Sequence, residues 1–303
     1  MILWDVAETL LASKTSRKVL QRLDKSPRAR KLLNRLSRPR GIFDSFEEAW
    51  RSATHEHYAG HDHPDAVKIH LNLSHSLRPS DYAALYWLSR IDTSGPLRVF
   101  DYGGNVGNVY YTYAKHLSAQ GRDVEWTVFD LPKNTQQGRE LAAARDETAL
   151  QFTDSVTGVD RGTVLLSSGA YHYWEKSAAE FLDQFSELPE HILVNRTPTI
   201  SKQPGFITVQ QTETYAVPCL VRNAEDLIAE FEGCGYVLVD RWKALELSVK
   251  MPMYPHRAVH GYSGFYFRRS APASDADRAG PTPSAQKTKE GTEPSRSAGT
   301  PTR

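Results

Sequence analysis

The hydrophobic positions change their period along the chain. Up to residue 94 the apolar residues follow helical spacing, and from Leu97 onward short apolar runs alternate with helical stretches. The runs predict strands at 97–100, 124–129, 149–152, 163–167, 191–194, 236–240 and 263–268, and the stretches predict helices at 109–118, 136–145, 177–185 and 224–231. This alternation is typical of βαβ units, so we predict a mainly parallel sheet covered by helices.

Two of the predicted helices begin at residues suited to capping. Asn223 precedes the helix 224–231, and Ser80 follows Pro79 ahead of a helix at 81–91. Asn and Ser side chains accept hydrogen bonds from the free amides of a first helical turn. With a short amphipathic stretch around Phe46 and Trp50, the second helix makes 41–94 a predicted helical region. We expect this region to pack on the sheet and to contribute to a substrate pocket.

Four parts of the chain differ in composition. A basic helical segment covers 1–40, the helical region covers 41–94, and the α/β domain covers 95–269. The remaining part, 270–303, contains no Val, Ile, Leu, Met, Phe, Trp, Tyr or Cys. Such a segment cannot bury enough apolar surface to offset its ordering entropy, so we predict that it is disordered.

Charge and cysteine content limit the function classes. The net charge is +1, yet the segment 14–40 holds eleven Lys and Arg residues against one acidic residue, Asp24. This segment is either a solvated helix pair or a contact to an anionic membrane surface, with RNA a third option that lacks aromatic stacking residues. Two cysteines build neither a disulfide framework nor a cysteine zinc site. We expect a cytoplasmic protein without a nucleic-acid partner, and peripheral attachment to the inner membrane is the alternative location.

Four histidines, 55, 57, 61 and 63, lie close together in the sequence. Their spacing does not match a standard zinc site, and we predict no metal.

A glycine-rich turn follows the first predicted strand. Asp101 and Tyr102 precede Gly103-Gly104-Asn105-Val106-Gly107. In an open α/β sheet, ligands bind beyond the carboxyl ends of the strands, and glycines there let the backbone approach a ligand. Asn105 and Asn108 occupy glycine positions of the dinucleotide fingerprint, and no Gly-Lys-Ser/Thr of a phosphate loop follows. Because Asn tolerates positive φ, the turn survives Asn105. An ordinary connection, or a site for another nucleotide, remains an alternative.

The turn resembles the first motif of class I S-adenosylmethionine-dependent methyltransferases. The segments 128–132 and 169–174 are similar to small-molecule O-methyltransferases of the plant caffeate type. A broader likeness over 41–269 is to an uncharacterised bacterial methyltransferase group that occurs with polysaccharide biosynthesis; it shares Gly-Ile-Phe-Asp-Ser-Phe-Glu-Glu-Ala at 41–49 and Asn-Arg-Thr-Pro at 195–198. The resemblance implies S-adenosyl-L-methionine as cofactor and a Rossmann-like, seven-stranded, mostly parallel sheet whose last strand is antiparallel.

The resemblance also implies cofactor-binding residues. The methionine half would be held by Asp101, Gly103, Gly104, Asn105 and Gly107. A carboxylate at the end of the second strand, Asp130, can accept hydrogen bonds from ribose hydroxyls. The adenine would contact Leu131, Asp154 and Ser155, and Ser168 is a further predicted cofactor-binding residue.

The catalytic and acceptor residues are hypotheses with open alternatives. His172 is a candidate general base because an imidazole takes up protons near neutral pH, and the alternative is a structural histidine. Arg196 either pairs with a carboxylate or phosphate of the substrate or belongs to a turn. The connections 198–221 and 243–262 are too long to be plain loops, and they supply Tyr215, Tyr254 and His256 as candidate substrate residues.

The reaction predicted from these residues is methyl transfer to a hydroxyl of a small molecule or saccharide. Ser167-Ser168-Gly169-Ala170 stands where enzymes that methylate nucleic-acid amino groups carry an Asn/Asp-Pro-Pro-Tyr motif. The alternatives are a non-catalytic scaffold with the same fold at a membrane surface, and another nucleotide-binding enzyme such as an oxidoreductase.

Overall fold

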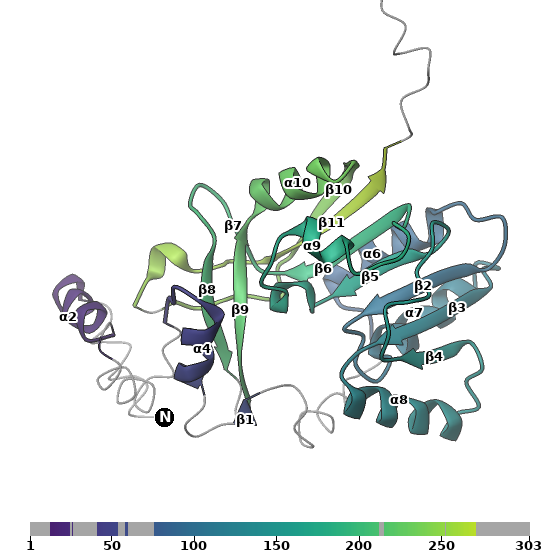
Figure 1. Cartoon of the computed structure of the whole chain (residues 1–303), viewed down its shortest axis with the longest axis horizontal. Helices are drawn as coiled ribbons and strands as arrows, with labels where there is room; N and C mark the ends of the chain where they lie inside the picture. The colour runs from purple at the N-terminus through teal and green to yellow at the C-terminus, as the bar shows by residue number, and fades with distance from the viewer. Residues whose placement is uncertain are drawn as a thin grey trace, which may run out of the picture. The chain divides into compact units, whose positions relative to one another are not determined.

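The computed structural model describes residues 13–24, 26, 41–53, 58–59, 76–211, 215–251 and 253–270 (Figure 1). The predictions for the histidines 55, 57, 61 and 63 and for the tail beyond Ser270 lie outside these residues. Within the basic segment, the helix α2 (Lys14–Asp24) is described. In the described part of the chain, no helix combines the length and apolar character needed to cross a membrane.

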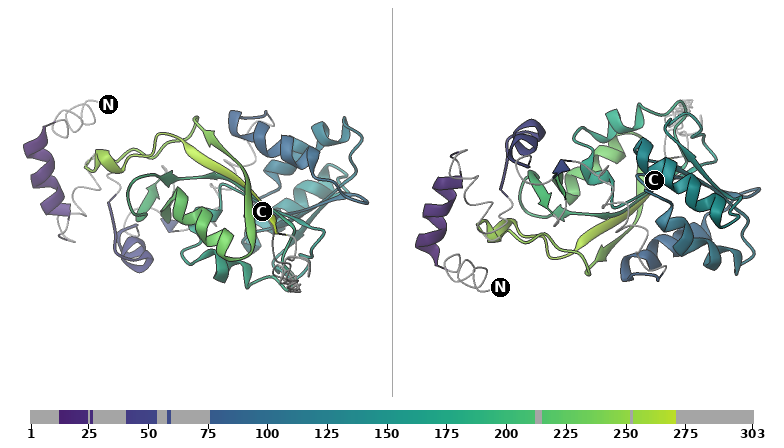
Figure 2. Two further views of the ribbon diagram at one scale, coloured as in Figure 1. Left: turned by 90° about the horizontal axis from the view of Figure 1, so that it is seen from above. Right: turned by 90° about the horizontal axis from the view of Figure 1, so that it is seen from below.

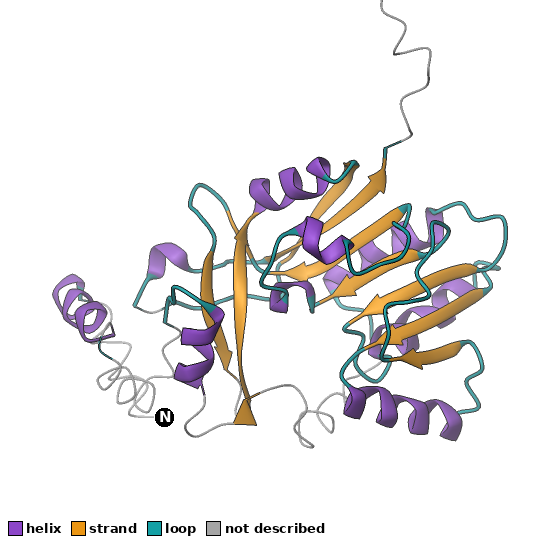
Figure 3. Ribbon diagram, in the orientation of Figure 1, coloured by secondary structure: helices purple, strands orange, loops and turns teal. Residues whose placement is uncertain are grey.

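The main sheet has seven strands in the order β10-β11-β6-β5-β2-β3-β4 (Figure 3). Its strands are β2 (Leu97–Tyr102), β3 (Val124–Phe129), β4 (Leu150–Thr153), β5 (Val164–Ser168), β6 (His191–Thr197), β10 (Tyr236–Ala244) and β11 (Tyr262–Arg269). Neighbours from β4 to β6 pair in parallel, whereas β11 is antiparallel to both β6 and β10. The predicted Rossmann-like, seven-stranded, mostly parallel sheet with an antiparallel last strand is therefore confirmed.

Helices cover both faces of this sheet (Figure 2). One core cluster joins α6 (Pro79–Arg90), α7 (Asn108–Ser118) and α8 (Pro132–Ala144) to the sheet, through buried residues such as Leu88, Tyr113 and Trp126. The other joins α9 (Ala178–Leu182) and α10 (Ala224–Gly233) to the opposite face, through Phe181 and Phe231. The strands β2, β5, β6 and β11 are largely buried on both faces, which explains their continuous apolar runs.

The two helix caps have different outcomes. Asn223 caps α10 as predicted, since its side chain accepts hydrogen bonds from the amides of Glu225 and Asp226. The prediction for Ser80 is wrong, because α6 begins at Pro79 and its N-cap residue is Arg78. Proline at the first helical position lacks only an N–H that would be unsatisfied anyway.

A second sheet was not predicted. It contains the hairpin of β8 (Phe206–Gln211) and β9 (Tyr215–Asn223), with β1 (Tyr58–Ala59) and β7 (Thr199–Ile200) paired to β9. The helix α4 (Phe46–Ala53) packs on this second sheet through Ala49, whereas α6 packs on the main sheet. Of the two helices predicted within 41–94, only α6 therefore packs on the main sheet. The long connection 198–221 therefore supplies β7, β8 and most of β9, the main strands of this second sheet.

Candidate functional site

The predicted site residues follow strands that end at one edge of the main sheet. Tyr102 pairs with Phe129, Phe129 with Thr153, and Ser168 with Asn195. Because these strands are parallel, their carboxyl ends share one edge, where α/β folds bind ligands. Asp101, Ser168 and Arg196 lie within the last two residues of their strands, and Asp130 and Asp154 directly follow theirs.

The glycine turn depends on residues without a side chain. Gly103 has a φ of 76°, and a Cβ there would collide with Ala170. At Gly104 a Cβ would lie 2.5 Å from Oδ2 of Asp101. Gly107, with a φ of 90°, is the N-cap of α7. The backbone of the turn thus lies directly on the carboxylate of Asp101 and leads into a helix whose first amides are free.

Asn105 adopts the conformation that was predicted for it. Its φ is 57°, in the left-handed region that Asn tolerates. Its side-chain Oδ1 accepts a hydrogen bond from the amide of Val106 at 2.8 Å. Its own amide donates to Oδ2 of Asp130 at 2.8 Å, so the next strand end holds the turn in place.

Asp130 has a structural role that the sequence did not indicate. Besides the amide of Asn105, its carboxylate accepts hydrogen bonds from the amide of Leu131 (2.7 Å) and from Nδ2 of Asn134 (2.6 Å). A carboxylate offers about four acceptor positions, so room for one further donor is left. Burial raises the pKa of Asp130, against the lowering effect of these hydrogen bonds.

Asp101 is the most unusual titratable group at this edge. It is fully buried, and its Oδ2 accepts a hydrogen bond from Nε1 of Trp126 at 3.1 Å. Its Oδ1 has no partner among the described residues. Burial, together with the nearby charge of Asp130, raises the pKa of Asp101 to about 7, although the bond from Trp126 lowers it. A cation placed beside Oδ1 would compensate this burial.

The predicted adenine contacts vary in exposure. Leu131 has 46% of its surface exposed, and Asp154 is also exposed. Ser155 is half-buried and its hydroxyl pairs with Thr157 at 2.8 Å. Ser168 accepts a hydrogen bond from Nδ2 of Asn195 at 3.2 Å, which ties β5 to β6.

His172 lies in a 3-10 turn, η1 (Tyr171–Tyr173), just after β5. Its side chain is 2% exposed and packs against Tyr173, with ring centroids 4.1 Å apart, and against Tyr262 at 6.1 Å. The hydroxyl of Tyr173 donates to Oε1 of Gln210 at 2.6 Å. The turn therefore connects the carboxyl edge of the main sheet to β8 of the second sheet.

The other predicted substrate residues lie with the second sheet. Tyr254 packs on the apolar cluster formed by Ile200, Val221 and their neighbours. His256 is exposed in η2 (Pro255–Arg257), and its backbone oxygen accepts a hydrogen bond from Gln203. Tyr215 begins β9, and its side chain is outside the described residues.

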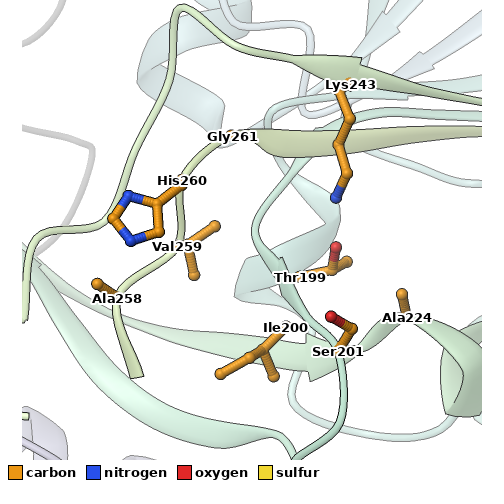
Figure 4. Close-up of a pocket in the computed structure, with 9 residues that line it drawn as sticks. All are labelled: Thr199, Ile200, Ser201, Ala224, Lys243, Ala258, Val259, His260 and Gly261. Carbon is orange, nitrogen blue, oxygen red and sulfur yellow. The ribbon is translucent and has the colours of Figure 1, made fainter. Parts of the chain in front are cut away.

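An open pocket of about 230 Å³ lies beyond the ends of β6 and β10 (Figure 4). The side chain of Lys243 points into it, and His260 lies across from it. Nζ of Lys243 donates to Oγ of Ser263 at 2.9 Å, and that hydroxyl pairs with Thr199 at 2.6 Å. Burial and the charge of Arg241 lower the pKa of Lys243. None of the glycine-turn residues lines this pocket.

Comparisons with known proteins give structural matches only. No protein-family model and no curated protein matches the sequence. The 1,6-didemethyltoxoflavin-N1-methyltransferase of Burkholderia thailandensis, solved with S-adenosylhomocysteine, is 17% identical over 68% of this chain and 83% of its own, with a TM-score of 0.44. The magnesium protoporphyrin IX methyltransferase of Synechocystis PCC 6803, solved with its cofactor, is 11% identical over 75% and 92%, with a TM-score of 0.42. The mitomycin 7-O-methyltransferase is 15% identical over 88% and 72%, also with a TM-score of 0.42. At these sequence identities and TM-scores, the assignment of a function to this chain rests on the geometry of the site itself.

Proposed function

We propose that this protein is an S-adenosyl-L-methionine-dependent methyltransferase that acts on a hydroxyl of a small molecule or saccharide. The observation that carries the proposal is the buried carboxylate of Asp101 beneath the glycine turn, with Oδ1 unpartnered among the described residues. An ammonium or sulfonium compound supplies the positive charge that such a group lacks. A pyrophosphate at the turn would instead place negative charge beside the buried Asp101, which argues against a dinucleotide cofactor.

The cofactor would follow the carboxyl edge from β2 to β4. The methionine half would lie against Asp101 and the turn formed by Gly103, Gly104, Asn105 and Gly107. Asp130 has one acceptor position left for a ribose hydroxyl. Leu131 offers an exposed apolar surface to the adenine ring, with Asp154, Ser155 and Ser168 as polar contacts. When bound, the cofactor supplies an electrophilic methyl group.

His172 is our candidate general base for the acceptor hydroxyl. It follows β5, whose end is next to those of β2 and β6. Removal of a proton from a hydroxyl as it attacks lowers the barrier, and holding the acceptor in line supplies much of the remaining acceleration. The packing of His172 between Tyr173 and Tyr262 fixes the imidazole in one place. Tyr215, Tyr254 and His256 would form a more distant wall contributed by the second sheet.

The proposal also covers the class of acceptor and the place in the cell where the enzyme acts. The saccharide class and a place in polysaccharide biosynthesis rest on the resemblance of the sequence. A cytoplasmic enzyme that contacts an anionic membrane surface would use the basic residues 14–40, of which α2 contributes Lys14, Arg17, Lys18 and Arg22.

Isothermal calorimetry with S-adenosylmethionine, S-adenosylhomocysteine and NAD tests the cofactor. We expect micromolar-range binding of the first two and none of NAD, with affinity lost in Asp101→Ala and Asp130→Ala. Asp160→Ala is the matched control, because Asp160 precedes β5 at the opposite edge of the sheet and pairs with Arg98 at 2.6 Å. Equal affinity in all three variants would show that the site has been placed wrongly.

A further inference from the structure

The end of β6 carries a β-bulge that faces Gly264. Thr197 pairs with Ser263 and Val194 with Phe265, so Asn195 and Arg196 together oppose one residue of β11. Arg196 has a φ of 57°, a left-handed conformation that is rare for arginine. Gly264 has no side chain because the indole of Trp242 occupies that space. Bulges of this kind often re-aim a side chain next to a functional site.

The bulge moves Arg196 to the other face of the sheet. Along β6, Ile192 and Val194 pack with α9 and α10, whereas Leu193 packs with α6 and α7. Simple alternation would place residue 196 on the side of Val194. The charged neighbours of Arg196 lie on the opposite side instead: Arg78 and Asp81 at the start of α6, Tyr113 on α7, and Glu246.

The polar partners around Arg196 are already engaged with one another. The carboxylate of Asp81 accepts hydrogen bonds from the hydroxyl of Tyr113 and from the amide of Arg78, each at 2.9 Å. Oε1 of Glu246 accepts from the amide and the hydroxyl of Ser80. These carboxylates attract Arg196 at a distance without accepting a hydrogen bond from it.

The guanidinium of Arg196 is half-buried, and in the part of the chain that the structure describes it makes no hydrogen bond and no ion pair. Its Nε is shielded from solvent. Burial, followed by the positive charge of Arg78, lowers the pKa of Arg196, so the surroundings disfavour the cation as it stands. The guanidinium of Arg196 therefore has its five N–H donors in a planar fork available for a ligand, beside the second arginine, Arg78.

We infer that Arg196 binds an anionic oxygen group of the methyl acceptor, a carboxylate or a phosphate, so that the acceptor is an acidic small molecule or an acidic saccharide. The description of the ligand as a methyl acceptor rests on the proposed function. The guanidinium fork matches two oxygens of a carboxylate or phosphate in a bidentate pair, and Arg78 adds a second positive charge. The position suits an acceptor, because Asn195, the preceding residue, is bonded to Ser168 at the end of β5.

The test measures melting temperature with inorganic phosphate, with acetate, and with chloride at the same ionic strength. Phosphate and acetate separate the two chemical forms of the anion. The parent protein is compared with Arg196→Met, which removes the charge and keeps much of the length. Arg90→Met is the control, because Arg90 is an exposed arginine at the end of α6. Calorimetry with S-adenosylhomocysteine is run on the same samples.

We expect phosphate or acetate to raise the melting temperature of the parent and of Arg90→Met by roughly 2–4 °C over chloride. Arg196→Met should lose this rise, and without anion it should melt no lower than the parent, since an unpaired cation has been removed from a half-buried site. No rise in the parent with either anion, or an undiminished rise in Arg196→Met, would overturn the inference. If the parent does not bind S-adenosylhomocysteine, the proposed function is refuted, whereas the result on anion binding by Arg196 still holds.

Discussion

At the residue scale, the turn after β2 is fixed by close contacts that the sequence shows only in part. The acidic residue and the glycines at 103, 104 and 107 were recognisable as a ligand loop, and the left-handed conformation of Asn105 was predicted from its chemistry. The bonds of Asp130 to Asn105 and Asn134 were not predictable, because they depend on how two strand ends lie side by side. The same holds for Trp126, whose contact to Asp101 crosses from one strand to the next.

Asp101 should make stability depend on pH. Its pKa rises from 3.8 to about 7 on folding, so the folded state binds more protons than the unfolded state between these values. The free energy of unfolding of the ligand-free protein should therefore fall as pH rises from about 4 to about 7. Asp101→Asn should remove this decrease of the free energy of unfolding with pH, and the variant should have a higher melting temperature than the parent at pH 7. Denaturant titrations across that range check it; identical slopes in both proteins would contradict the raised pKa.

Gly104 should not tolerate even a methyl group. In Gly104→Ala the added carbon would lie 2.5 Å from Oδ2 of Asp101, so the turn must shift. Overpacking of this kind costs about 1–3 kcal/mol, and the affinity for S-adenosylmethionine should fall with it. Gly95→Ala is the control, since no atom lies within 4 Å of a Cβ there. Thermal melts and calorimetry on both variants decide the matter, and equal behaviour would mean that the turn is not tightly packed on Asp101.

His172→Ala should reduce turnover by about 10² to 10⁴ while the affinity for the cofactor stays nearly constant, because general-base assistance is worth about that factor. His172→Gln separates orientation from proton transfer, since it keeps a hydrogen-bonding side chain without a base. Activity within a few-fold of the parent in the alanine variant would make His172 a structural residue.

At the element scale, the repeating βαβ pattern was readable because the central strands of the main sheet are largely buried on both faces and each helix keeps its own period. The antiparallel β11 followed from the resemblance, and its pairing with β6 confirms it. The hairpin β8–β9 was missed because its strands pair mainly with each other across a connection, and neighbouring polar residues such as Gln210 and Gln211 weaken the alternation. The cap of α6 was misplaced by two residues because Pro79 can begin a helix itself.

One of the contacts that couple the hairpin to η1 is a side-chain hydrogen bond, beside the stacking of Arg222 on Tyr171. The hydroxyl of Tyr173 donates to Gln210 at 2.6 Å, across the gap between the two sheets' edges. Tyr173→Phe removes that bond and keeps the ring that packs on His172. We expect a loss of about 1 kcal/mol in stability, the usual net value of such a bond. Tyr82→Phe, which changes an exposed tyrosine, should have no effect, and a Tyr173→Phe protein as stable as this control would show that the bond contributes nothing.

At the scale of the whole molecule, charge is unevenly distributed, and this gives α2 a testable role. Lys14, Lys18 and Arg22 lie on the helix together with Val19 and Leu23, which are 52% and 43% exposed. A helix that exposes basic and apolar residues together is suited to an anionic lipid surface.

The protein should therefore bind vesicles that contain acidic lipid, and this binding should weaken as salt is added. Each basic residue near the surface contributes about 1 kcal/mol, so Lys18→Glu with Arg22→Glu should weaken binding by more than tenfold. The charge-matched control is Lys115→Glu with Arg90→Glu, at exposed residues of α7 and α6, and it should leave vesicle binding unchanged. Equal sedimentation with neutral vesicles, or none at low salt, would leave α2 as a solvated helix, because neither result is compatible with electrostatic docking.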